Sequence, residues 1–410
     1  MKPLEGIRVL DLSRVLAGPW ATQTLADLGA EVIKVEQPGS GDDTRHWGPP
    51  WHQRGDERVA AYFLAANRGK RSVAIDFGAP EGACLVAEMA ASADVVVENF
   101  KVGGLEKFGL DAATLRAANP RLIYASITGF GQDGPYAGRA GYDYIIQGMG
   151  GLMSLTGLPD GAPGGGPMRV GVAVADLFTG MYTANAILAA LVRRGVTGEG
   201  AMIDLALFDT QLAMLANQAS NALVSGSDPQ RQGAGHPNIV PYQPFAASDQ
   251  PIIIAVGNDR QFGKLAAILG HPDWAADPVY ATNASRVAAR ETLVPMIAAI
   301  ISRKTAAEWL EQLEKGGIPA GPINSVLQAL GDSQAVHRGA RVEAGGGLLG
   351  EVPMVGSPIR IDGARCDAPF PPPGLGEHRD LLGEWISEDE LARLTANGIV
   401  GQPSQGRKAI

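Results

Sequence analysis

Ile7-Arg-Val-Leu-Asp-Leu12 is a short, mostly apolar run of the kind that forms a buried strand. A loop follows at Arg14–Pro19, then a helical pattern from about Trp20 to Leu28 and a second strand pattern at Glu31–Glu36. A strand, a helix and a second strand in this order form a βαβ unit, whose two strands lie parallel. The first residues of the chain therefore predict the start of a parallel α/β sheet.

The same alternation continues downstream. Strand patterns at Ser72–Ile75, Asp94–Val97 and Leu122–Ile127 alternate with helical stretches near Pro80–Ala91 and Asp111–Ala117. This order predicts a mostly parallel sheet with helices packed on it. Ligands of such sheets bind at the C-terminal ends of the strands, so we expect the functional residues in the loops that follow them.

A stretch dominated by glycine and proline, from Gly157 to Gly171, separates this region from two predicted helices. It should form a long irregular loop, and loops of this length often carry function. The helix after it is predicted at Leu177–Arg194, with Gly195 as its stop. A second helix is predicted at about Leu205–Leu223.

Polar residues at Ser225–Gln232 mark a predicted domain boundary. We therefore divide the chain into a large domain at 1–224, a small domain at 225–328, and a return to the large domain at 329–410 that ends in a short helix. The small domain is predicted to be α/β as well. Its strand and helices are predicted at Pro251–Val256, Phe262–Leu269, Glu291–Arg303 and Ala306–Lys315.

The charge balance and the cysteines limit the classes of function. The chain has 34 Lys and Arg against 43 Asp and Glu, a net charge of −9, which opposes binding to nucleic acid or to an anionic membrane. It has no run of about 20 apolar residues free of charge, Gly and Pro. The two cysteines, Cys84 and Cys366, lack the spacing of a metal site. We expect a cytoplasmic protein with two free thiols, no metal, and neither nucleic acid nor membrane as a partner.

Asp176, in Val172-Ala-Val-Ala-Asp-Leu-Phe-Thr-Gly180, immediately precedes the predicted helix. The simplest interpretation is an N-cap, because an Asp side chain accepts hydrogen bonds from the free N–H groups of a helix start. A second role is compatible with it. A helix N-terminus favours the ionised carboxylate, and apolar neighbours remove water from it, which leaves an anion able to attack a carbonyl carbon. Asp176 is therefore the candidate nucleophile.

Basic residues cluster in the first 140 positions of this acidic chain. Solvent-exposed surface charge is the simplest explanation for each. Together, at loops and strand ends, they would suit a ligand with a 3′-phosphate and a diphosphate, such as coenzyme A (CoA). Glu36 ends the second strand, where a dinucleotide-binding fold has its ribose-binding acid. A nicotinamide or flavin dinucleotide is nevertheless disfavoured, because the first βα turn, Arg14–Pro19, lacks the GxGxxG glycines. The residues of the cluster are Arg45, Arg68, Lys70, Arg71, Lys101, Lys107 and Arg139.

A set of longer motifs resembles the family III CoA-transferases over nearly the whole chain. The motifs are Pro3-Leu-Glu-Gly-Ile-Arg-Val-Leu-Asp-Leu12, Leu16-Ala-Gly-Pro19, Leu28-Gly-Ala-Glu-Val-Ile-Lys-Val-Glu36, Gly39-Ser-Gly-Asp-Asp-Thr-Arg45, Asn67-Arg-Gly-Lys-Arg-Ser72, Glu98-Asn-Phe100, Gly141-Tyr-Asp143 and Gly376-Glu-His378. The resemblance implies a large Rossmann-like parallel-sheet domain built from both chain ends, a smaller α/β domain, and a homodimer of interlocked chains.

The resemblance also implies a reaction and a site. Asp176 corresponds to the family's nucleophile, which would form an aspartyl anhydride and then an aspartyl-CoA thioester. An acyl-CoA and a free carboxylic acid would be the substrates, with no tightly bound cofactor. The residues that would bind CoA are Val15, Leu16, Ala17, Gln37, Arg71, Ile75, Asp76, Asn99, Phe100, Lys101, Lys107, Arg139, Ala140, Gly141, Tyr142 and Asp143.

Stretches such as Gly41–Pro50 and Ile239–Gln243 look most like the branch of succinyl-CoA:glutarate (hydroxymethylglutarate) CoA-transferases, which implies dicarboxylic acids on both sides of the reaction. A distal carboxylate would need a cation, and Arg45 and His236 are the candidates. His236 follows Gly235 in a loop that corresponds to the family's mobile shielding loop. Taken alone, His236 could be a general base, but an ordinary loop residue is the simpler interpretation.

Two other functions stay open. The 2-methylacyl-CoA racemases of the same family use a histidine in a Gly-His-Asp motif, where this chain has Gly141-Tyr142-Asp143. A tyrosine, with an ordinary pKa of about 10, is a poor base near neutral pH. The other is a non-catalytic CoA-binding protein. It would have the same contacts with CoA but would not need a reactive Asp176.

Overall fold

The computed structural model describes residues 2–368 and 370–403. The chain forms two compact units: the first comprises Met1–Leu152, Val170–Ser220 and Ser333–Ile410, and the second comprises Met153–Arg169 and Asn221–Asp332. The second unit therefore takes in 153–169, which the sequence-based division placed in the large domain.

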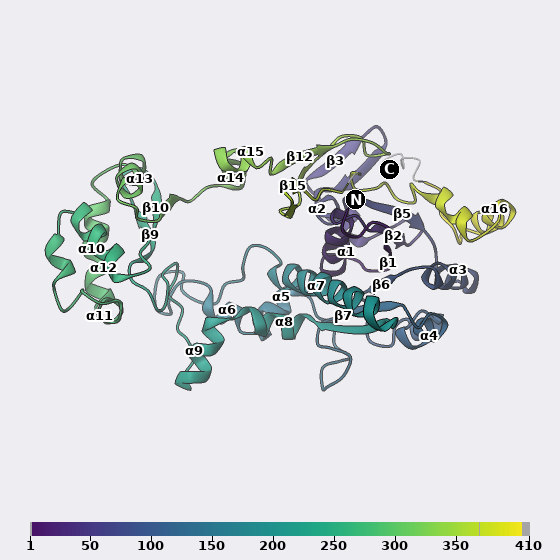
Figure 1. Ribbon diagram of the computed structural model, residues 1–410, viewed down its shortest axis with the longest axis horizontal. Coiled ribbons are helices and arrows are strands. Elements are labelled where there is room, and N and C mark those ends of the chain that lie inside the picture. Colours follow the sequence, from purple (N-terminus) through teal and green to yellow (C-terminus); the bar gives the residue numbers. More distant parts are fainter. Residues whose placement is uncertain (1, 369, 404–410) are drawn as a thin grey trace. The chain divides into compact units, whose positions relative to one another are not determined.

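A six-stranded sheet forms the centre of the first unit, in the order β5-β2-β1-β6-β7-β8 with all neighbours parallel (Figure 1). The predicted parallel α/β sheet is confirmed. Strand order reverses between β1 and β6, and in doubly wound folds a crevice for ligands opens there, beyond the C-terminal strand ends. The strands are β1 (Arg8–Asp11), β2 (Glu31–Glu36), β5 (Lys70–Ala74), β6 (Val95–Glu98), β7 (Ile123–Thr128) and β8 (Ala201–Ala206).

Helices cover both faces of this sheet because neighbouring strand residues point to opposite sides. On one face Val9 packs with α1 (Ala17–Asp27) and α7 (Val174–Thr197). On the other, Leu10 packs with α3 (Pro80–Ala91), α4 (Ala112–Ala118) and the C-terminal α16 (Glu388–Ala396) (Figure 1). An isolated bridge between Ile75 and Val400 joins the two ends of the chain.

The helix predicted at Leu205–Leu223 is confirmed only in part, because its first two residues belong to a strand and the rest forms two helices instead of one. Residues 201–206 form β8, and α8 (Leu207–Met214) and α9 (Asn217–Ser225) follow as separate helices. Ala216 interrupts them with a positive φ of 48°. Asp204 interrupts the apolar residues of the strand, and α8 begins directly after Ala206 with no turn residue between them, so the sequence does not mark where the strand ends and the helix begins.

Two predicted helix limits also differ. α1 begins at Ala17, inside the predicted loop, and α7 extends from Val174 to Thr197 rather than from Leu177 to Arg194. Gly198, with φ 78°, is the left-handed C-cap, so Gly195 lies within the helix. Among the described residues α7 is also the one helix long and apolar enough to fit a membrane span by length and composition. Its inward residues, such as Ile187, pack in the core of the first unit.

The remaining elements of the first unit lie in its connections and C-terminal part. They are η1 (Asp43–His46), β3 (Trp51–Arg54), β4 (Glu57–Ala60), α2 (Ala61–Ala65), η2 (Glu106–Phe108), α5 (Asp143–Met149), α15 (Ser333–His337), β12 (Arg341–Ala344), β13 (Val352–Val355), β14 (Arg360–Ile361), β15 (Ala364–Arg365) and η4 (Arg379–Glu384); α6 (Leu152–Leu155) spans the boundary between the units.

The second unit has its own core, with Ile252, Phe262 and Trp309 fully covered. A three-stranded antiparallel sheet, β11-β10-β9, packs with helices, so the predicted α/β character is confirmed. Its elements are β9 (Tyr242–Ala246), β10 (Pro251–Ala255), α10 (Asp259–Ile268), η3 (Pro272–Ala275), α11 (Asn283–Ala288), α12 (Arg290–Ile301), α13 (Ala306–Lys315), β11 (Ala320–Pro322) and α14 (Val326–Gly331).

Candidate active site

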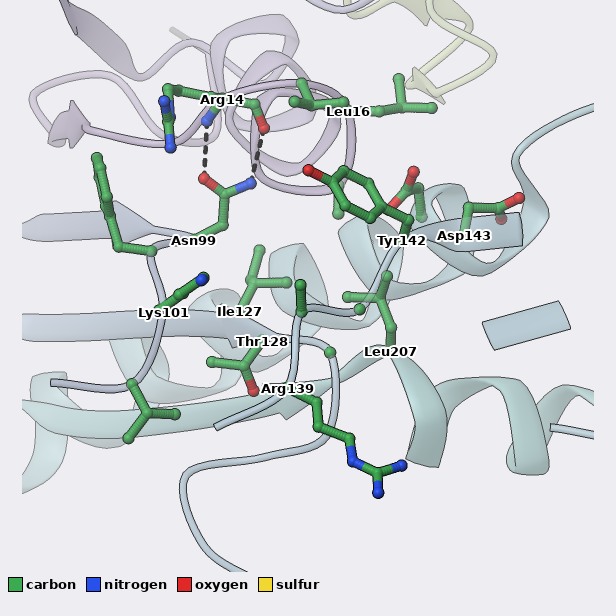
Figure 2. A pocket seen from close by; sticks show the side chains of 18 of the residues that line it. Arg14, Leu16, Asn99, Lys101, Ile127, Thr128, Arg139, Tyr142, Asp143 and Leu207 are labelled. Carbon is green, nitrogen blue, oxygen red and sulfur yellow. Dashed lines mark hydrogen bonds between the residues drawn. The ribbon is translucent and has the colours of Figure 1, made fainter. Parts of the chain in front are cut away.

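A cavity of about 220 Å³ opens beyond the C-terminal ends of β1, β6 and β7, at the point where strand order reverses (Figure 2). We call it the first cavity. Loops after these strands and the start of α7 form its wall. The predicted site residues that line it are Val15, Leu16, Ala17, Asn99, Phe100, Lys101, Arg139, Ala140, Gly141, Tyr142, Asp143 and Asp176.

Asp176 lies in the first turn of α7, two residues inside the helix start at Val174. The prediction that it caps the helix is wrong: the N-cap position is Ala173, and it provides no side-chain cap. The carboxylate of Asp143 instead accepts a hydrogen bond of 2.9 Å from the backbone N–H of Ala175. Because another helix satisfies this N–H, the carboxylate of Asp176 is left to face the cavity.

The environment of Asp176 raises its pKa to about 7, chiefly because burial disfavours the charged form and secondly because the negative charge of Asp143 is near. Of the two effects expected from the sequence, the loss of water around Asp176 outweighs the preference of the helix N-terminus for the ionised carboxylate. Near neutral pH the carboxylate and the carboxylic acid coexist. A carboxylate with a raised pKa is less stabilised by its surroundings and is a better nucleophile than an ordinary surface aspartate.

Asp143 is itself held in place from several sides. Its Oδ2 accepts a hydrogen bond of 2.7 Å from Nε2 of Gln147, and Oε1 of Gln147 accepts one of 2.9 Å from the backbone N–H of Val170. The preceding backbone is packed closely: a Cβ on Gly141 would lie 2.2 Å from the Cα of Gly129. A side chain at either glycine would push this wall of the cavity apart.

The loops after β1 and β6 are joined by Arg14 and Asn99. The backbone N–H of Arg14 donates to Oδ1 of Asn99 at 2.8 Å, and Nδ2 of Asn99 donates to the carbonyl of Arg14 at 2.7 Å (Figure 2). Asn99 was predicted as a CoA contact, whereas Arg14 was not predicted as a site residue. The pair fixes the width of the crevice where the strand order reverses.

Val15 has a positive φ of 70°, which is strained for a β-branched residue. Its N–H donates to both carboxylate oxygens of Asp42, at 3.2 and 3.3 Å, and Asp42 forms a fully buried ion pair of 3.0 Å with Lys34. Sequence reasoning missed this support. Lys34, within a mostly apolar strand pattern, could have indicated it. A lysine is fully buried only where it is paired with an acidic residue.

A second cavity of about 340 Å³ includes the predicted residues Gln37 and Asp76. It shares Arg14, Asp43 and Phe100 with the first cavity, and we call these three residues the neck. The two cavities therefore meet along one edge of the sheet. Together they can accept an extended ligand rather than a compact one.

Three predicted CoA contacts line neither cavity. Ile75 is fully buried beside the sheet, Arg71 lies 3.3 Å from a carboxylate oxygen of Glu31, and the amine of Lys107 lies 4.7 Å from the ring centroid of Phe108. Their proposed contacts with CoA stay predictions.

The prediction that the clustered basic residues face solvent or phosphate is wrong for three of them. Lys70 is fully buried and pairs with Asp11 at 2.9 Å. Arg68 pairs with Asp27, and Arg45 binds both carboxylate oxygens of Glu36, each at 2.7 Å. Both are buried as well. Arg45 therefore has a structural role, and it cannot bind a substrate carboxylate without leaving the buried Glu36 unpaired.

Gly235 and His236 lie in the second unit, in a loop held by Arg290. The guanidinium of Arg290 donates to the carbonyl oxygens of His236 and Pro237, each at 2.8 Å. The ring of His236 accepts a hydrogen bond of 3.1 Å from the N–H of Asn238. Within its unit this loop is a defined structure with its own contacts.

Tyr62, on α2, was missed by the sequence analysis. Burial raises the pKa of its phenol, and the negative charges of Asp176 and Asp143 raise it further. The hydroxyl is therefore within electrostatic range of the candidate nucleophile and stays protonated near neutral pH. Its ring packs edge-on against Trp47, with the ring centroids 5.3 Å apart.

Comparison with known proteins identifies the family. The sequence model of CoA-transferase family III matches residues 4–379. The chain belongs to CoA-transferase family III. As a family III CoA-transferase it is an enzyme, and the predicted resemblance is confirmed. Among the described residues no group of three or more His, Cys, Asp or Glu side chains is placed to hold a metal ion.

Relatives of this CoA-transferase cover almost its whole length. It is 52% identical to the succinate–glutarate CoA-transferase of Agrobacterium fabrum over 96% of this chain and 97% of that protein. It is 43% identical to the succinyl-CoA:glutarate CoA-transferase of Mus musculus over 98% of this chain and 91% of the relative. It is 40% identical to the acetyl-CoA:oxalate CoA-transferase of Acetobacter aceti over 91% and 92% of the two chains.

Solved structures agree with this assignment. A CAIB/BAIF family protein from Brucella suis is 51% identical, with a TM-score of 0.82 over 93% of this chain and 99% of that one. The protein Rv3272 from Mycobacterium tuberculosis is 32% identical, also with a TM-score of 0.82 and the same coverage.

Proposed function

We propose that this CoA-transferase moves CoA from succinyl-CoA to a second dicarboxylic acid such as glutarate. The names of the relatives from Agrobacterium fabrum and Mus musculus support this choice of donor and acceptor. Relatives named for oxalate and D-citramalate, at 40% and 35% identity, support the wider class of dicarboxylate acceptors. His236 stays a candidate for the distal carboxylate, while Arg45 is excluded by its bond to Glu36.

Asp176 is the proposed nucleophile, and its position in the cavity wall with a pKa of about 7 carries the proposal. Its carboxylate attacks the thioester carbonyl of succinyl-CoA; the C–S bond breaks, and an aspartyl–succinyl anhydride and CoA thiolate result. The thiolate then attacks the aspartyl carbonyl, which releases succinate and leaves an aspartyl-CoA thioester. No proton is transferred in either step.

The acceptor carboxylate completes the cycle. It attacks the aspartyl-CoA carbonyl and expels CoA thiolate, which forms a new anhydride. The thiolate then attacks the acceptor's acyl carbon, which gives the new acyl-CoA and the free carboxylate of Asp176. Each intermediate keeps the activation of the original thioester, provided that water is excluded from the cavity.

CoA is proposed to lie along both cavities. The pantetheine arm would occupy the first cavity between Leu16 and Gly141, so that the thioester reaches Asp176, and the adenosine would enter the second cavity near Gln37 and Asp76. The two adjoining cavities together are long enough in shape for CoA, which is an extended ligand. Interlocked homodimer formation and a cytoplasmic location stay predictions.

A racemase would need a base at the position of Tyr142. The sequence Gly141-Tyr142-Asp143 provides a phenol there, and Figure 2 shows it beside Asp143 in the first cavity. A phenol is a weak base near neutral pH. The structure gives the racemase no further support.

The proposed function is tested by a screen of acceptor acids with succinyl-CoA: glutarate, itaconate, malate, oxalate and formate. Borohydride or hydroxylamine added after succinyl-CoA should modify Asp176, since both reagents react with an aspartyl thioester. Transfer that survives in Asp176→Ala would refute the mechanism. Bound CoA with no modification and no transfer would support the binding-protein alternative, and deuterium uptake at the α-carbon of a 2-methylacyl-CoA would support the racemase.

A further inference from the structure

The two cavities that adjoin at the neck contain few cations that can reach a ligand. Those among the described lining residues are Arg14, Lys34, Lys101 and Arg139. Lys34 is fully buried, with its amine 3.0 Å from Asp42 and 2.7 Å from the carbonyl oxygen of Ser13. The guanidinium of Arg139 lies 3.9 Å from the ring centroid of Tyr136 and points away from the cavity centre (Figure 2). Arg14 and Lys101 remain.

Arg14 stands where both cavities meet. Its side chain is 49% exposed, and its nearest acidic partner, Asp43, is 3.9 Å away across a similarly exposed surface. Such a pair contributes little energy in solvent. The carbon at the centre of the guanidinium lies 4.9 Å from the ring centroid of Phe100, so the planar group is supported on one face while its N–H donors stay free to bind.

The position of Arg14 also separates two possible ligand groups. In Figure 2 Arg14 lies beside Asn99 on one side of the first cavity, and Tyr142 and Asp143 lie on the other. The reacting acyl group must lie on the side of Asp143, whose charge acts on Asp176. A cation at the opposite end faces the part of CoA between the pantetheine arm and the adenosine.

We propose that Arg14 binds the diphosphate of the CoA thioester at the neck. This inference rests on the proposed use of an acyl-CoA and adds a residue to its binding site. The guanidinium presents paired N–H donors that match phosphate oxygens. The second cavity is otherwise rich in carboxylates, with Glu36, Asp42, Asp43 and Asp76 along its wall. Glu36 and Asp42 are paired with Arg45 and Lys34, so the phosphate charges would meet the carboxylates of Asp43 and Asp76 there if Arg14 were absent.

The backbone of Arg14 is held by Asn99 rather than through its own side chain. The variant Arg14→Gln therefore keeps both of these hydrogen bonds and should fold with an unchanged Tm. Arg260→Gln, at an exposed arginine in the first turn of α10 that lines neither cavity, is the matched control.

The experiment compares three donors: succinyl-CoA, succinyl-3′-dephospho-CoA, and succinyl-pantetheine, which lacks the diphosphate and the adenosine. In Arg14→Gln we expect KM to rise about tenfold or more for the first two donors, because a charge-assisted hydrogen bond is lost. For succinyl-pantetheine KM should stay as in the wild type, and kcat should change little for all three.

Three results would overturn the inference: an equal rise in KM for succinyl-pantetheine, no rise for succinyl-CoA, or a rise that vanishes with the 3′-dephospho donor. The last would assign Arg14 to the 3′-phosphate instead. If the wild-type protein transfers nothing, calorimetric titration with CoA, 3′-dephospho-CoA and pantetheine makes the same comparison. Failure of the proposed transfer reaction is thereby distinguished from failure of the Arg14 assignment.

Discussion

The carboxylate of Asp143 accepts a 2.9 Å hydrogen bond from the N–H of Ala175, the residue directly before Asp176. One side chain thus satisfies the start of α7 and also places a negative charge near the nucleophile, which raises the pKa of Asp176. Position and reactivity of Asp176 are therefore coupled through Asp143. The first two predictions test these effects.

Replacement of Asp176 should remove activity and increase stability. Because the pKa of Asp176 is raised, the folded state binds the proton of this carboxyl group more tightly than the unfolded state does. The free energy of unfolding therefore decreases as the pH rises from about 4 to about 7. Above about pH 7 the decrease is complete. We expect Asp176→Asn to lower turnover at least about a thousandfold. At pH 8 its free energy of unfolding should exceed that of the wild type by about 1–2 kcal/mol, which is less than full conversion of the pKa shift because the carboxylate lies in the wall of an open cavity.

Thermal unfolding of Asp176→Asn and the wild type at pH 4 and pH 8 measures this gain, with Asp56→Asn as the exposed control. The Tm difference should appear at pH 8 and be nearly absent at pH 4. A variant less stable than the wild type at pH 8 would contradict the assigned environment.

Asp143→Asn should separate charge from position. The asparagine can still accept from the N–H of Ala175, but it carries no charge, so the pKa of Asp176 should fall, although burial still holds it above an ordinary aspartate. In the wild type kcat/KM should decline below about pH 7, by about tenfold per pH unit. In the variant this decline should begin at a lower pH. Superimposable pH profiles would show that Asp143 does not act through its charge.

Val15→Gly should relieve strain and loosen the CoA site. Glycine adopts a φ of 70° freely, so we expect a net gain of about 1 kcal/mol after the entropy cost of a more flexible chain. The KM for succinyl-CoA should rise a few-fold because the loop is less rigid. Val15→Ala keeps the Cβ and with it part of the strain, so its gain in Tm should be smaller than that of Val15→Gly. Equal gains in both variants would refute the strain argument.

Lys70→Met should destabilise the first unit because it leaves Asp11 charged and fully buried without its partner. The expected loss is about 3–5 kcal/mol. In the double variant Asp11→Asn with Lys70→Met the charge is gone. The asparagine oxygen can still accept from Ser13, and its amide nitrogen, in the place of Oδ2, can donate to the hydroxyl of Thr22. Calorimetry should find its Tm well above that of the single variant. A double variant as unstable as Lys70→Met would show that the ion pair is not the cause.

The sequence by itself determined the sheet and most of its helices. A buried strand requires a run of apolar residues, and an amphipathic helix requires apolar residues three or four positions apart, so both can be seen in the sequence. The helix at Pro80–Ala91 matches α3 along its whole length. The sequence also singled out Asp176 and most of the residues that line the first cavity, through local motifs. It missed β8, which contains Asp204 and passes directly into α8 with no turn residue to separate strand from helix.

Only the tertiary structure decided what the charged residues do. Arg45, Arg68 and Lys70 looked like ligand-binding cations and are instead buried in ion pairs, with Glu36, Asp27 and Asp11 on other elements of the first unit. Asp176 looked like an ionised helix cap and is a carboxyl group with a raised pKa. The composition of the sequence and the spacing of its residues show only which side chains can carry a charge. Whether a charge is buried, paired or free to meet a ligand depends on which distant segments the fold brings beside it.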